Sequence, residues 1–418
     1  LEFRRVLFRS MTGVPAGKAI IVGGSLSGLF AGLLLRKHGC RVDIYERSGH
    51  ELTGRGAGIV THQPLWDALD DIGIPWRANL GVEVATRRMF GRDGRLLLEV
   101  DCPQTMTAWD RMYDLLRQAF SPEHYRLGKE LVSIEQDDSQ VTATFADGTR
   151  VDADLLIGCD GIRSSVRGHF LPGVVPAYAG YVAWRGLVPE SAFPPSLHEQ
   201  VFSHLAFCLP PGEQMLGYPV AGPNNDLRPG HRRYNLVWYR PADRDSTLQR
   251  LLTDDSGALH AISIPPPAVS RGAVAEMREA AESVLAPQFR DCWRMTDAPF
   301  LQAIYDVQSP QLAFGRVTMI GDASYVARPH CGAGVTKAAD DAVALIDALS
   351  TSSTVAEALQ RYEALRVPFG CHVVGYARQL GAYLQAQLKT QEERDAAERH
   401  FSPEAVLRDT ATVGFMTV

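Results

Sequence analysis

Short apolar runs and longer segments with helical spacing alternate near the start of the chain. Residues 18–22 form a β-branched run that ends at Gly23, and residues 26–38 then carry apolar side chains at helical spacing. A further short run, 41–45, ends on Glu46. This order predicts a strand, a tight turn, a helix and a second strand, which together begin a Rossmann-type unit.

The pattern changes farther along the chain. Between residues 172 and 310, strand-like runs are separated by many prolines, which predicts a sheet that roofs a pocket. A buried strand and a helix follow, and apolar spacing from Val355 onward predicts long closing helices that Pro368 kinks. We therefore predict an α/β fold in which a Rossmann-type domain (11–171 and 311–349) is interleaved with a β-sheet substrate domain (172–310) and followed by C-terminal helices (350–418).

Composition excludes several classes of function. The chain has 42 basic and 48 acidic side chains, a net charge of −6 and no basic block suited to a phosphate backbone, so nucleic acid is not an expected partner. Its seven cysteines are scattered without paired metal-ligand spacing, which predicts no metal site and favours a reduced cytoplasm. No apolar run approaches the roughly 20 residues that span a bilayer, so no membrane is expected. Residues 1–10 lack the apolar stretch of a signal peptide, and we expect them to be a non-native leader before Met11.

The turn after the first strand has the sequence Gly23-Gly24-Ser25-Leu26-Ser27-Gly28. Gly23 and Gly28 allow the backbone to approach a pyrophosphate, and N–H groups at the helix start supply donors. Ser25 stands where the dinucleotide fingerprint prefers glycine, but it leaves a hydroxyl at the site. The residues that we expect to hold a dinucleotide here are Gly23, Ser25, Leu26, Ser27 and Gly28.

An acid follows at the spacing typical of ribose binding. Glu46 lies 18 residues after Gly28, at the end of the second predicted strand. We expect it to accept a hydrogen bond from the adenosine ribose, and a solvated strand end is the alternative. Arg47 either faces the adenine or a phosphate, or is solvated.

Two later segments again place glycine beside an acid where a strand ends. Asp160-Gly161 follows the apolar run 155–157, and Gly321-Asp322 follows the run 317–320. An Asp-Gly pair by itself is also a common turn. Three such segments in this order nevertheless predict a flavin dinucleotide site, with Asp322 at the ribityl chain or the pyrophosphate.

These segments resemble the motifs of the class A flavoprotein aromatic hydroxylases, single-component monooxygenases with a GR2-like FAD-binding domain and the para-hydroxybenzoate hydroxylase fold. More narrowly, Gly180 to Gly186, the serine-containing first turn and Arg328-Pro329-His330 resemble the 2,6-dihydroxypyridine 3-hydroxylase branch. The resemblance implies FAD, NADH or NADPH as electron donor, O2 as co-substrate and a homodimer. It also implies hydroxylation of a hydroxylated N-heteroaromatic (hydroxypyridine-like) or phenolic ring through a flavin C4a-hydroperoxide.

The resemblance assigns further cofactor contacts. Asp160 and Gly161 are placed at the pyrophosphate side, with Arg167 as an aid to NAD(P)H binding. The loop 54–59 is placed beside the isoalloxazine, where Arg55 holds either the cofactor or the substrate. Arg111 is placed at an FAD phosphate or ribityl oxygen, and a surface arginine is its alternative. A loop and helix start are placed at the flavin pyrimidine, where backbone N–H groups stabilise negative charge. The residues of that segment are Pro329, Gly332, Ala333, Gly334 and Val335.

At three positions, the third motif can be compared with the resembled family residue by residue. Tyr325 stands where many relatives of the resembled family carry histidine, and Ala333 where many carry glutamine. Neither change removes a backbone contact. Asp341 matches an acid within the helix of that motif, and a solvated helix acid is the alternative.

Substrate handling is expected from His330, because it precedes the flavin-facing helix and can exchange protons near neutral pH. A structural histidine is the alternative. Tyr218 and His204 are second candidates, although sheet packing is favoured for both. Trp184 and Trp238 are expected to be core aromatics.

Other functions are compatible with the same fold. One is a flavin reductase or a halogenase-like enzyme, although the Trp-x-Trp-x-Ile-Pro signature of halogenases is absent. Another is an FAD-binding sensor without turnover. The chain has no convincing Ser-His-Asp or paired-carboxylate constellation, which agrees with chemistry carried by a cofactor.

Overall fold

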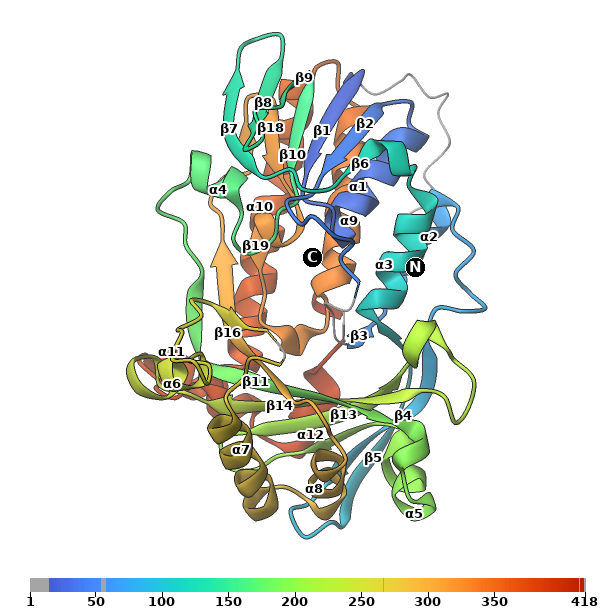
Figure 1. Ribbon diagram of the computed structural model, residues 1–418, viewed down its shortest axis with the longest axis vertical. Helices are drawn as coiled ribbons and strands as arrows, with labels where there is room; N and C mark the ends of the chain where they lie inside the picture. Colours follow the sequence, from blue (N-terminus) through green and yellow to red (C-terminus); the bar gives the residue numbers. More distant parts are fainter. Residues whose placement is uncertain (1–14, 54–57, 266, 413, 417–418) are drawn as a thin grey trace.

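The computed structural model describes residues 15–53, 58–265, 267–412 and 414–416. A mostly parallel sheet with its helices lies at the top of Figure 1, and a larger, mostly antiparallel sheet lies below it. The expected leader, residues 1–10, and the expected flavin-side Arg55 lie outside the described residues.

The upper sheet has six strands in the order β17-β18-β10-β1-β2-β6, and all neighbours run parallel except β17 and β18. Its central strands are almost continuously buried, as a parallel sheet covered on both faces requires. The strands are β1 (Lys18–Val22), β2 (Arg41–Tyr45), β6 (Tyr125–Arg126), β10 (Leu155–Gly158), β17 (Ala313–Phe314) and β18 (Val317–Met319).

Helices and a small meander pack around this sheet. Helix α1 packs on α9, and α9 packs on α10. Helix α10 continues through Pro368 to Leu380. These helices are α1 (Leu26–Lys37), α2 (Gln63–Ile72), α3 (Trp109–Ala119), α4 (Ser165–Phe170), α9 (Gly334–Ser350) and α10 (Val355–Leu380). The meander consists of β7 (Leu131–Gln136), β8 (Val141–Phe145) and β9 (Arg150–Ala153).

The carboxyl ends of three central strands lie side by side. Val22 of β1 pairs with Gly158 of β10, and Gly158 pairs with Met319 of β18. The three glycine-containing segments that follow these strands therefore meet at one edge of the sheet, although they are far apart in sequence. This edge is where open parallel sheets bind ligands.

The lower sheet follows the order β15-β16-β11-β14-β13-β12-β4-β5-β3, and β19 pairs with β16. Its neighbours run antiparallel except β12 and β4. The strands are β3 (Gly58–Val60), β4 (Val82–Phe90), β5 (Leu96–Ala108), β11 (Ala177–Pro189), β12 (His204–Cys208), β13 (Gln214–Val220), β14 (Arg233–Pro241), β15 (Ser263–Ile264), β16 (Phe300–Gln308) and β19 (Tyr325–Val326).

Strands β3 to β5 come from residues 58–108, which the sequence-based division assigns to the first part of the Rossmann-type domain. They join the lower sheet because β4 pairs with β12. The local residue pattern does not reveal a pairing between segments so far apart.

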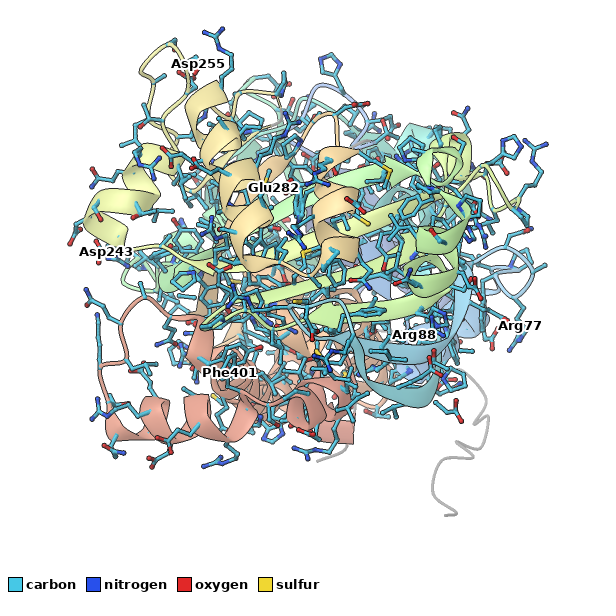
Figure 2. All side chains as sticks on the ribbon, turned by 90° about the horizontal axis from the view of Figure 1, so that it is seen from below. Arg77, Arg88, Asp243, Asp255, Glu282 and Phe401 are labelled. Carbon is cyan, nitrogen blue, oxygen red and sulfur yellow. The ribbon has the colours of Figure 1, made fainter. Side chains whose placement is uncertain are left out.

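The two faces of the lower sheet differ in what covers them. Helices α7 and α8 lie beneath it in Figure 1 and in front of it in Figure 2, where Glu282 marks α7. Trp184 and Trp238 are buried in this outer core, which confirms the expectation that they are core aromatics. The inner face packs against α11 and α12. These outer and inner helices are α5 (Pro195–Leu197), α6 (Gln249–Leu251), α7 (Arg271–Val284), α8 (Pro287–Arg294), α11 (Gln391–His400) and α12 (Pro403–Asp409).

No helix in the described ranges is both long and apolar enough to cross a membrane. No cluster of histidine, cysteine, aspartate and glutamate within those ranges could hold a metal ion.

Candidate active site

The first glycine turn is built by close backbone contacts. Gly23 has φ +105°, and a Cβ there would lie 2.4 Å from the Cys159 carbonyl oxygen. A Cβ on Gly28 would lie 2.0 Å from the carbonyl oxygen of Gly23. Only glycine fits both places. The contact with Cys159 brings the first turn directly against the second motif.

The helix that follows presents unused donors. Ser25 is the N-cap residue of α1, with φ −78°, so this position does not demand glycine. Its side chain makes no capping hydrogen bond, and the first turn of α1 contains no acid. Leu26 and Ser27 begin the helix, where backbone N–H groups have no intrahelical acceptor. An anion such as a pyrophosphate suits them.

Glu46 is buried at the end of β2 and is 6% exposed. It accepts hydrogen bonds from the backbone N–H groups of Gly24, at 2.9 Å, and Ser48, at 2.8 Å. Each carboxylate oxygen can accept a further bond, so a ribose hydroxyl can still be bound. Arg47 is exposed.

Asp160 has a local partner that its sequence position does not reveal. Its carboxylate accepts from the Ser164 hydroxyl at 2.5 Å and from the Ser165 N–H at 2.6 Å. It thereby caps the start of α4. Burial raises the pKa of this carboxyl. Gly161, which follows, has φ +75°, a backbone conformation that glycine adopts without a steric penalty.

The guanidinium of Arg167 joins the second motif to the third. It donates to the carbonyl oxygens of Ala323, at 2.9 Å, Val174, at 3.2 Å, and Ile162. These bonds use all three nitrogens of the side chain, and Arg167 is only 3% exposed. The geometry therefore gives Arg167 a structural role and does not favour the expected role in NAD(P)H binding.

Asp322 lines the mouth of the site, and its side chain is 52% exposed. Buried Lys337 of α9 donates to its Oδ1 at 2.9 Å. A Cβ on Gly321, which has φ +61°, would lie 2.8 Å from the Cβ of Ser27. The third motif thus touches the first helix at the place where Asp322 reaches the surface.

Asp341 is fully buried and is not a solvated helix acid. It accepts from the Gly321 N–H at 3.0 Å and from the Tyr325 hydroxyl at 2.9 Å. Arg366 of α10 lies 2.5 Å from it and 2.7 Å from Asp340. This network fixes the Gly321 turn, and Tyr325 is part of it.

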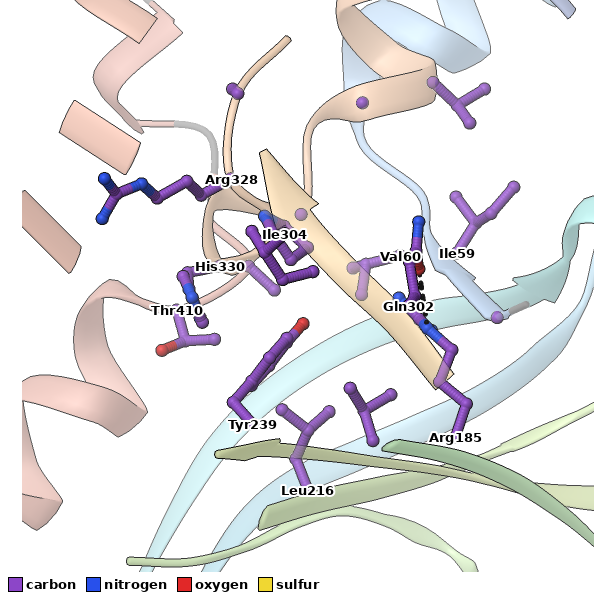
Figure 3. A pocket seen from close by; sticks show the side chains of 18 of the residues that line it. Ile59, Val60, Arg185, Leu216, Tyr239, Gln302, Ile304, Arg328, His330 and Thr410 are labelled. Carbon is purple, nitrogen blue, oxygen red and sulfur yellow. Dashed lines mark hydrogen bonds between the residues drawn. The ribbon is translucent and has the colours of Figure 1, made fainter. Parts of the chain in front are cut away.

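A cavity of about 300 Å³ lies between the third motif and the inner face of the lower sheet. Figure 3 shows His330 and Tyr239 on one side of it and the pair Arg185 and Gln302 on the other. Arg328 points away from it and donates to Asp306 and Gln385. Of the expected site residues, the lining includes Tyr218, Asp322, Pro329, His330, Gly332, Gly334 and Val335.

His330 is 2% exposed, and its Nε2 lies 2.8 Å from the Tyr181 hydroxyl. Burial, with a contribution from the charge of Arg328, lowers its pKa to about 3. Its Nδ1 is buried and has no hydrogen-bond partner within the described ranges. His330 is therefore neutral at physiological pH, so the expected exchange of protons near neutral pH is not supported, and its buried Nδ1 can form a hydrogen bond.

The flavin-facing backbone lies at one end of the cavity. Gly332 has φ +63°, Ala333 is the N-cap residue of α9, and Gly334 begins the helix. The first N–H groups of α9, at Gly334 and Val335, have no intrahelical acceptor. Gly334 and Val335 line the cavity, and negative charge is favoured at such a helix N-terminus.

Arg111 and His204 have other partners. Arg111, near the start of α3, donates from Nε to the Asn79 carbonyl at 2.8 Å, which leaves its terminal N–H groups for a phosphate. His204 does not line the cavity, and its Nδ1 lies 2.6 Å from the Thr86 hydroxyl. A catalytic role for His204 is therefore not supported by its position at the first residue of β12, outside the cavity.

The sequence predicted no role for Arg185, Gln302 or Tyr181, although the stretch from Gly180 to Gly186 contains two of them. Arg185 donates from Nε to Gln302 Oε1 at 3.1 Å inside the cavity. The signal was present in β11, where alternate residues face opposite sides. Because Trp184 faces the outer core, Arg185 must face inward, as Tyr181 does.

The residues present fit FAD. The first turn of α1 has backbone N–H groups without an intrahelical acceptor and contains no acid, which suits a pyrophosphate. Glu46 can still accept from a ribose hydroxyl, and Asp322 exposes its carboxylate near the cavity. Glycine keeps the turn compact, because protein atoms already occupy the Cβ positions of Gly23 and Gly28.

Two family models and several characterised proteins match this chain in sequence. Residues 21–92 match the family described as NAD(P)-binding Rossmann-like domain, and residues 178–306 match the one described as FAD binding domain-like. The chain is 32% identical over 372 residues to 2,6-dihydroxypyridine 3-monooxygenase from Paenarthrobacter nicotinovorans, which covers 87% of this chain and 91% of the relative. It is 28% identical over 396 residues to 3-hydroxybenzoate 6-hydroxylase from Klebsiella oxytoca, with 88% and 89% covered.

A solved structure agrees with the fold. The structure of 2,6-dihydroxypyridine-3-hydroxylase from Arthrobacter nicotinovorans matches with a TM-score of 0.84 and 30% identity, over 93% of this chain and 96% of that one. The predicted α/β fold, with a Rossmann-type FAD-binding domain and a sheet domain, is confirmed. FAD, NAD(P)H and O2, expected from the sequence, are the cofactor and co-substrates of such an enzyme. The chain belongs to the family of FAD-dependent aromatic monooxygenases.

Proposed function

We propose that this enzyme hydroxylates a hydroxylated N-heteroaromatic ring of the hydroxypyridine kind, or a phenolic ring, and that the ring binds as its anion. One observation carries the proposal: Arg185 places a guanidinium without a counter-ion in the cavity. The site residues named above are proposed to act on this substrate and on FAD.

Arg185 is 9% exposed and has no carboxylate partner in the described part of the chain. Its bond to Gln302 uses Nε and leaves the terminal N–H groups for a ligand. A buried cation without a partner is unfavourable, and a planar guanidinium suits planar pairs of acceptors. The anion of a 2-hydroxypyridine offers an oxygen and a ring nitrogen in one plane, whereas a phenolate offers only the oxygen. The arginine therefore favours the N-heteroaromatic substrate.

The rest of the cavity suits a flat ring. Leu216, Val237 and Ile304 line its apolar walls. Burial raises the pKa of Tyr218 to about 12, so its hydroxyl stays protonated and can donate to a substrate oxygen. The relative named 2,6-dihydroxypyridine 3-monooxygenase supports a ring of this class.

When bound, FAD supplies hydride acceptance from NAD(P)H, reaction with O2 and transfer of one oxygen atom to the ring. Arg185 stabilises the ring oxyanion, which raises electron density at the ring carbons ortho and para to it. The N–H groups at the start of α9 favour negative charge beside them. Tyr181 holds neutral His330 against the cavity wall and helps to keep water out.

The first test uses the purified protein. Its visible spectrum is recorded, NADH and NADPH oxidation is followed with a panel of hydroxypyridines and phenols, and products are identified by mass. A yellow protein that yields a product heavier by one oxygen supports the proposal. A yellow protein without stimulated turnover contradicts it and favours another flavin reaction or a sensor.

Two arginine variants test whether Arg185 binds an anionic substrate. Arg185→Met is expected to raise KM for the hydroxylated ring at least tenfold, because the anion loses its partner. Arg399→Met, at an exposed site on α11, serves as the control. An unchanged KM in Arg185→Met would remove the reason for an anionic substrate.

We also propose that the enzyme acts in the cytoplasm on a small aromatic molecule. All seven cysteines are free, which supports a reducing compartment. A homodimer and the absence of nucleic-acid and membrane partners stay predictions.

A further inference from the structure

Arg87 of β4 is fully buried without a counter-ion. It is 0% exposed, and none of the described carboxylates pairs with it. Nε and one terminal nitrogen donate to Gln104 Oε1, at 3.1 and 2.7 Å. Its remaining bonds go to backbone carbonyls of one distant segment.

That segment is the end of α12 and the residues after it. Arg87 donates to the carbonyl oxygens of Leu407, at 2.7 Å, Thr410, at 2.6 Å, and Ala411, at 3.1 Å. Gln104 adds a bond from Nε2 to the Ala411 oxygen at 3.0 Å. Arginine is suited to this task because it carries five donors in a fixed plane.

Ala411 has an unusual backbone. Its φ is +52°, in the left-handed region that a residue with a Cβ adopts at an energetic cost. The surrounding bonds must hold it there. Those bonds come from Arg87 and Gln104 on its carbonyl and from its own N–H, which donates to the His330 carbonyl at 2.7 Å.

The held segment forms part of the cavity wall. Thr410 and Ala411 line the cavity, and Figure 3 shows Thr410 beside His330. A Cβ on Gly332 would lie 2.8 Å from the Cα of Ala411, so the segment sits directly on the loop that carries His330. A shift of the segment therefore changes both the cavity and this loop.

We propose that Arg87 is a positioning residue that clamps residues 407–411 against the His330 loop and so sets the fit of the aromatic substrate. It acts through backbone carbonyls and does not touch the substrate. This inference rests on the proposed function for its kinetic effects, but the clamp itself has a readout that needs no turnover.

The test compares Arg87→Met with Arg88→Met in the FAD-loaded protein. Arg88, the next residue on β4, points to the other face of the strand, where it donates to the carbonyls of Glu199 and Gln200. Figure 2 shows it at the edge of the lower sheet. Hydrogen exchange of the backbone amides at 402–412 and 329–336 is measured first. We expect at least tenfold faster exchange there in Arg87→Met alone, and unchanged exchange in both variants would overturn the clamp.

The kinetic readout separates fit from general loss of stability. Arg87→Met is expected to raise KM for the aromatic substrate at least fivefold, and the Kd for FAD is measured beside it because residues 329–335 are also expected to contact the flavin. A larger share of NAD(P)H should be used to reduce O2 to H2O2. Arg87→Lys should recover part of both effects, because an ammonium reaches some of the same carbonyls. Equal KM and equal H2O2 yield in all variants would overturn the role in substrate fit.

A milder variant covers the case in which Arg87→Met does not fold. Gln104→Leu removes one of the two bonds to the Ala411 carbonyl and the shared acceptor of two Arg87 nitrogens, but it keeps the Arg87 bonds to Leu407, Thr410 and Ala411. We expect the same direction of change in amide exchange and KM, at two- to fivefold. If wild-type protein turns over no aromatic ring, the proposed function fails, whereas the exchange data still decide the clamp.

Discussion

Buried Lys337 donates a hydrogen bond to the solvent-facing carboxylate of Asp322, 2.9 Å away. The lysine side chain is 1% exposed and the aspartate side chain is 52% exposed. The ammonium also lies 4.7 Å from the centre of the Tyr325 ring. Lys337 thus fixes one carboxylate oxygen of Asp322 by a hydrogen bond and leaves the other oxygen for a cofactor.

Asp322→Ala is expected to lose FAD. The carboxylate is placed to accept from a ribityl or phosphate-side hydroxyl, and a hydrogen bond to a charged group contributes about 1.5–3 kcal/mol. This corresponds to about a 10- to 100-fold rise in the Kd for FAD, measured by quenching of flavin fluorescence. Asp245→Ala, at an exposed position, should bind FAD normally. An FAD-replete Asp322→Ala protein would refute the cofactor site drawn here.

Lys337→Met is expected to weaken FAD binding less than Asp322→Ala. The carboxylate remains, but it loses the partner that orients it. Lys337→Arg should retain much of the affinity if orientation by a cation is the cause. The check is the Kd for FAD in both variants at low and high salt. Identical Kd values for wild type and Lys337→Met would show that FAD binding does not depend on the hydrogen bond from Lys337 to Asp322.

Arg366→Met is expected to destabilise the fold by about 3–5 kcal/mol. Arg366 is the cation between Asp340 and Asp341, and its removal leaves the buried Asp341 carboxylate without a counter-ion. Urea unfolding with and without FAD measures the change. Arg361→Met on the same helix removes an exposed arginine that donates to the Thr351 carbonyl, and it should change the free energy of unfolding by less than about 1 kcal/mol.

Acid should destabilise the protein through two buried histidines. Burial lowers the pKa of His330 from 6.5 to about 3 and that of His62 to about 4. Below pH 6.5 the unfolded chain binds protons that the folded chain does not. The free energy of unfolding therefore falls by up to about 1.4 kcal/mol per pH unit for each histidine, until the pH nears the folded pKa.

Urea unfolding between pH 7.5 and 5 tests this dependence. His62→Gln should show a shallower fall below pH 6.5 than wild type. His50→Gln, at an exposed histidine, should keep the wild-type slope. Parallel curves for all three proteins would mean that His62 takes up a proton in the folded state.

Gly381→Ala is expected to damage the active site from outside the cavity. A Cβ on Gly381 would lie 2.6 Å from the Tyr181 hydroxyl and 2.9 Å from His330 Cδ2. The pair must separate, so kcat/KM should fall at least tenfold while FAD content stays normal. Gly375→Ala on α10 meets no atom within 4 Å and should gain up to about 1 kcal/mol of helix stability with normal turnover. Normal turnover in Gly381→Ala would show that the Tyr181 and His330 contact is dispensable.

The sequence by itself determined the Rossmann-type strand, turn and helix and the meeting of three glycine-containing motifs. These features can be predicted from local chemistry. Only glycine permits the close backbone approach at Gly23, and the apolar run 155–157 indicates a buried strand. The same motifs were sufficient to predict the protein family and its cofactor, FAD.

Only the tertiary structure decided which side chains share the cavity. Asp160 caps a helix, His204 lies outside the cavity, and Arg185 lies inside it without a counter-ion. The partners of His204 and Arg185 come from distant strands, so composition and spacing cannot identify them. Arg87 is the clearest case, because its acceptors are backbone carbonyls more than 300 positions away, and backbone carbonyls leave no mark in the sequence.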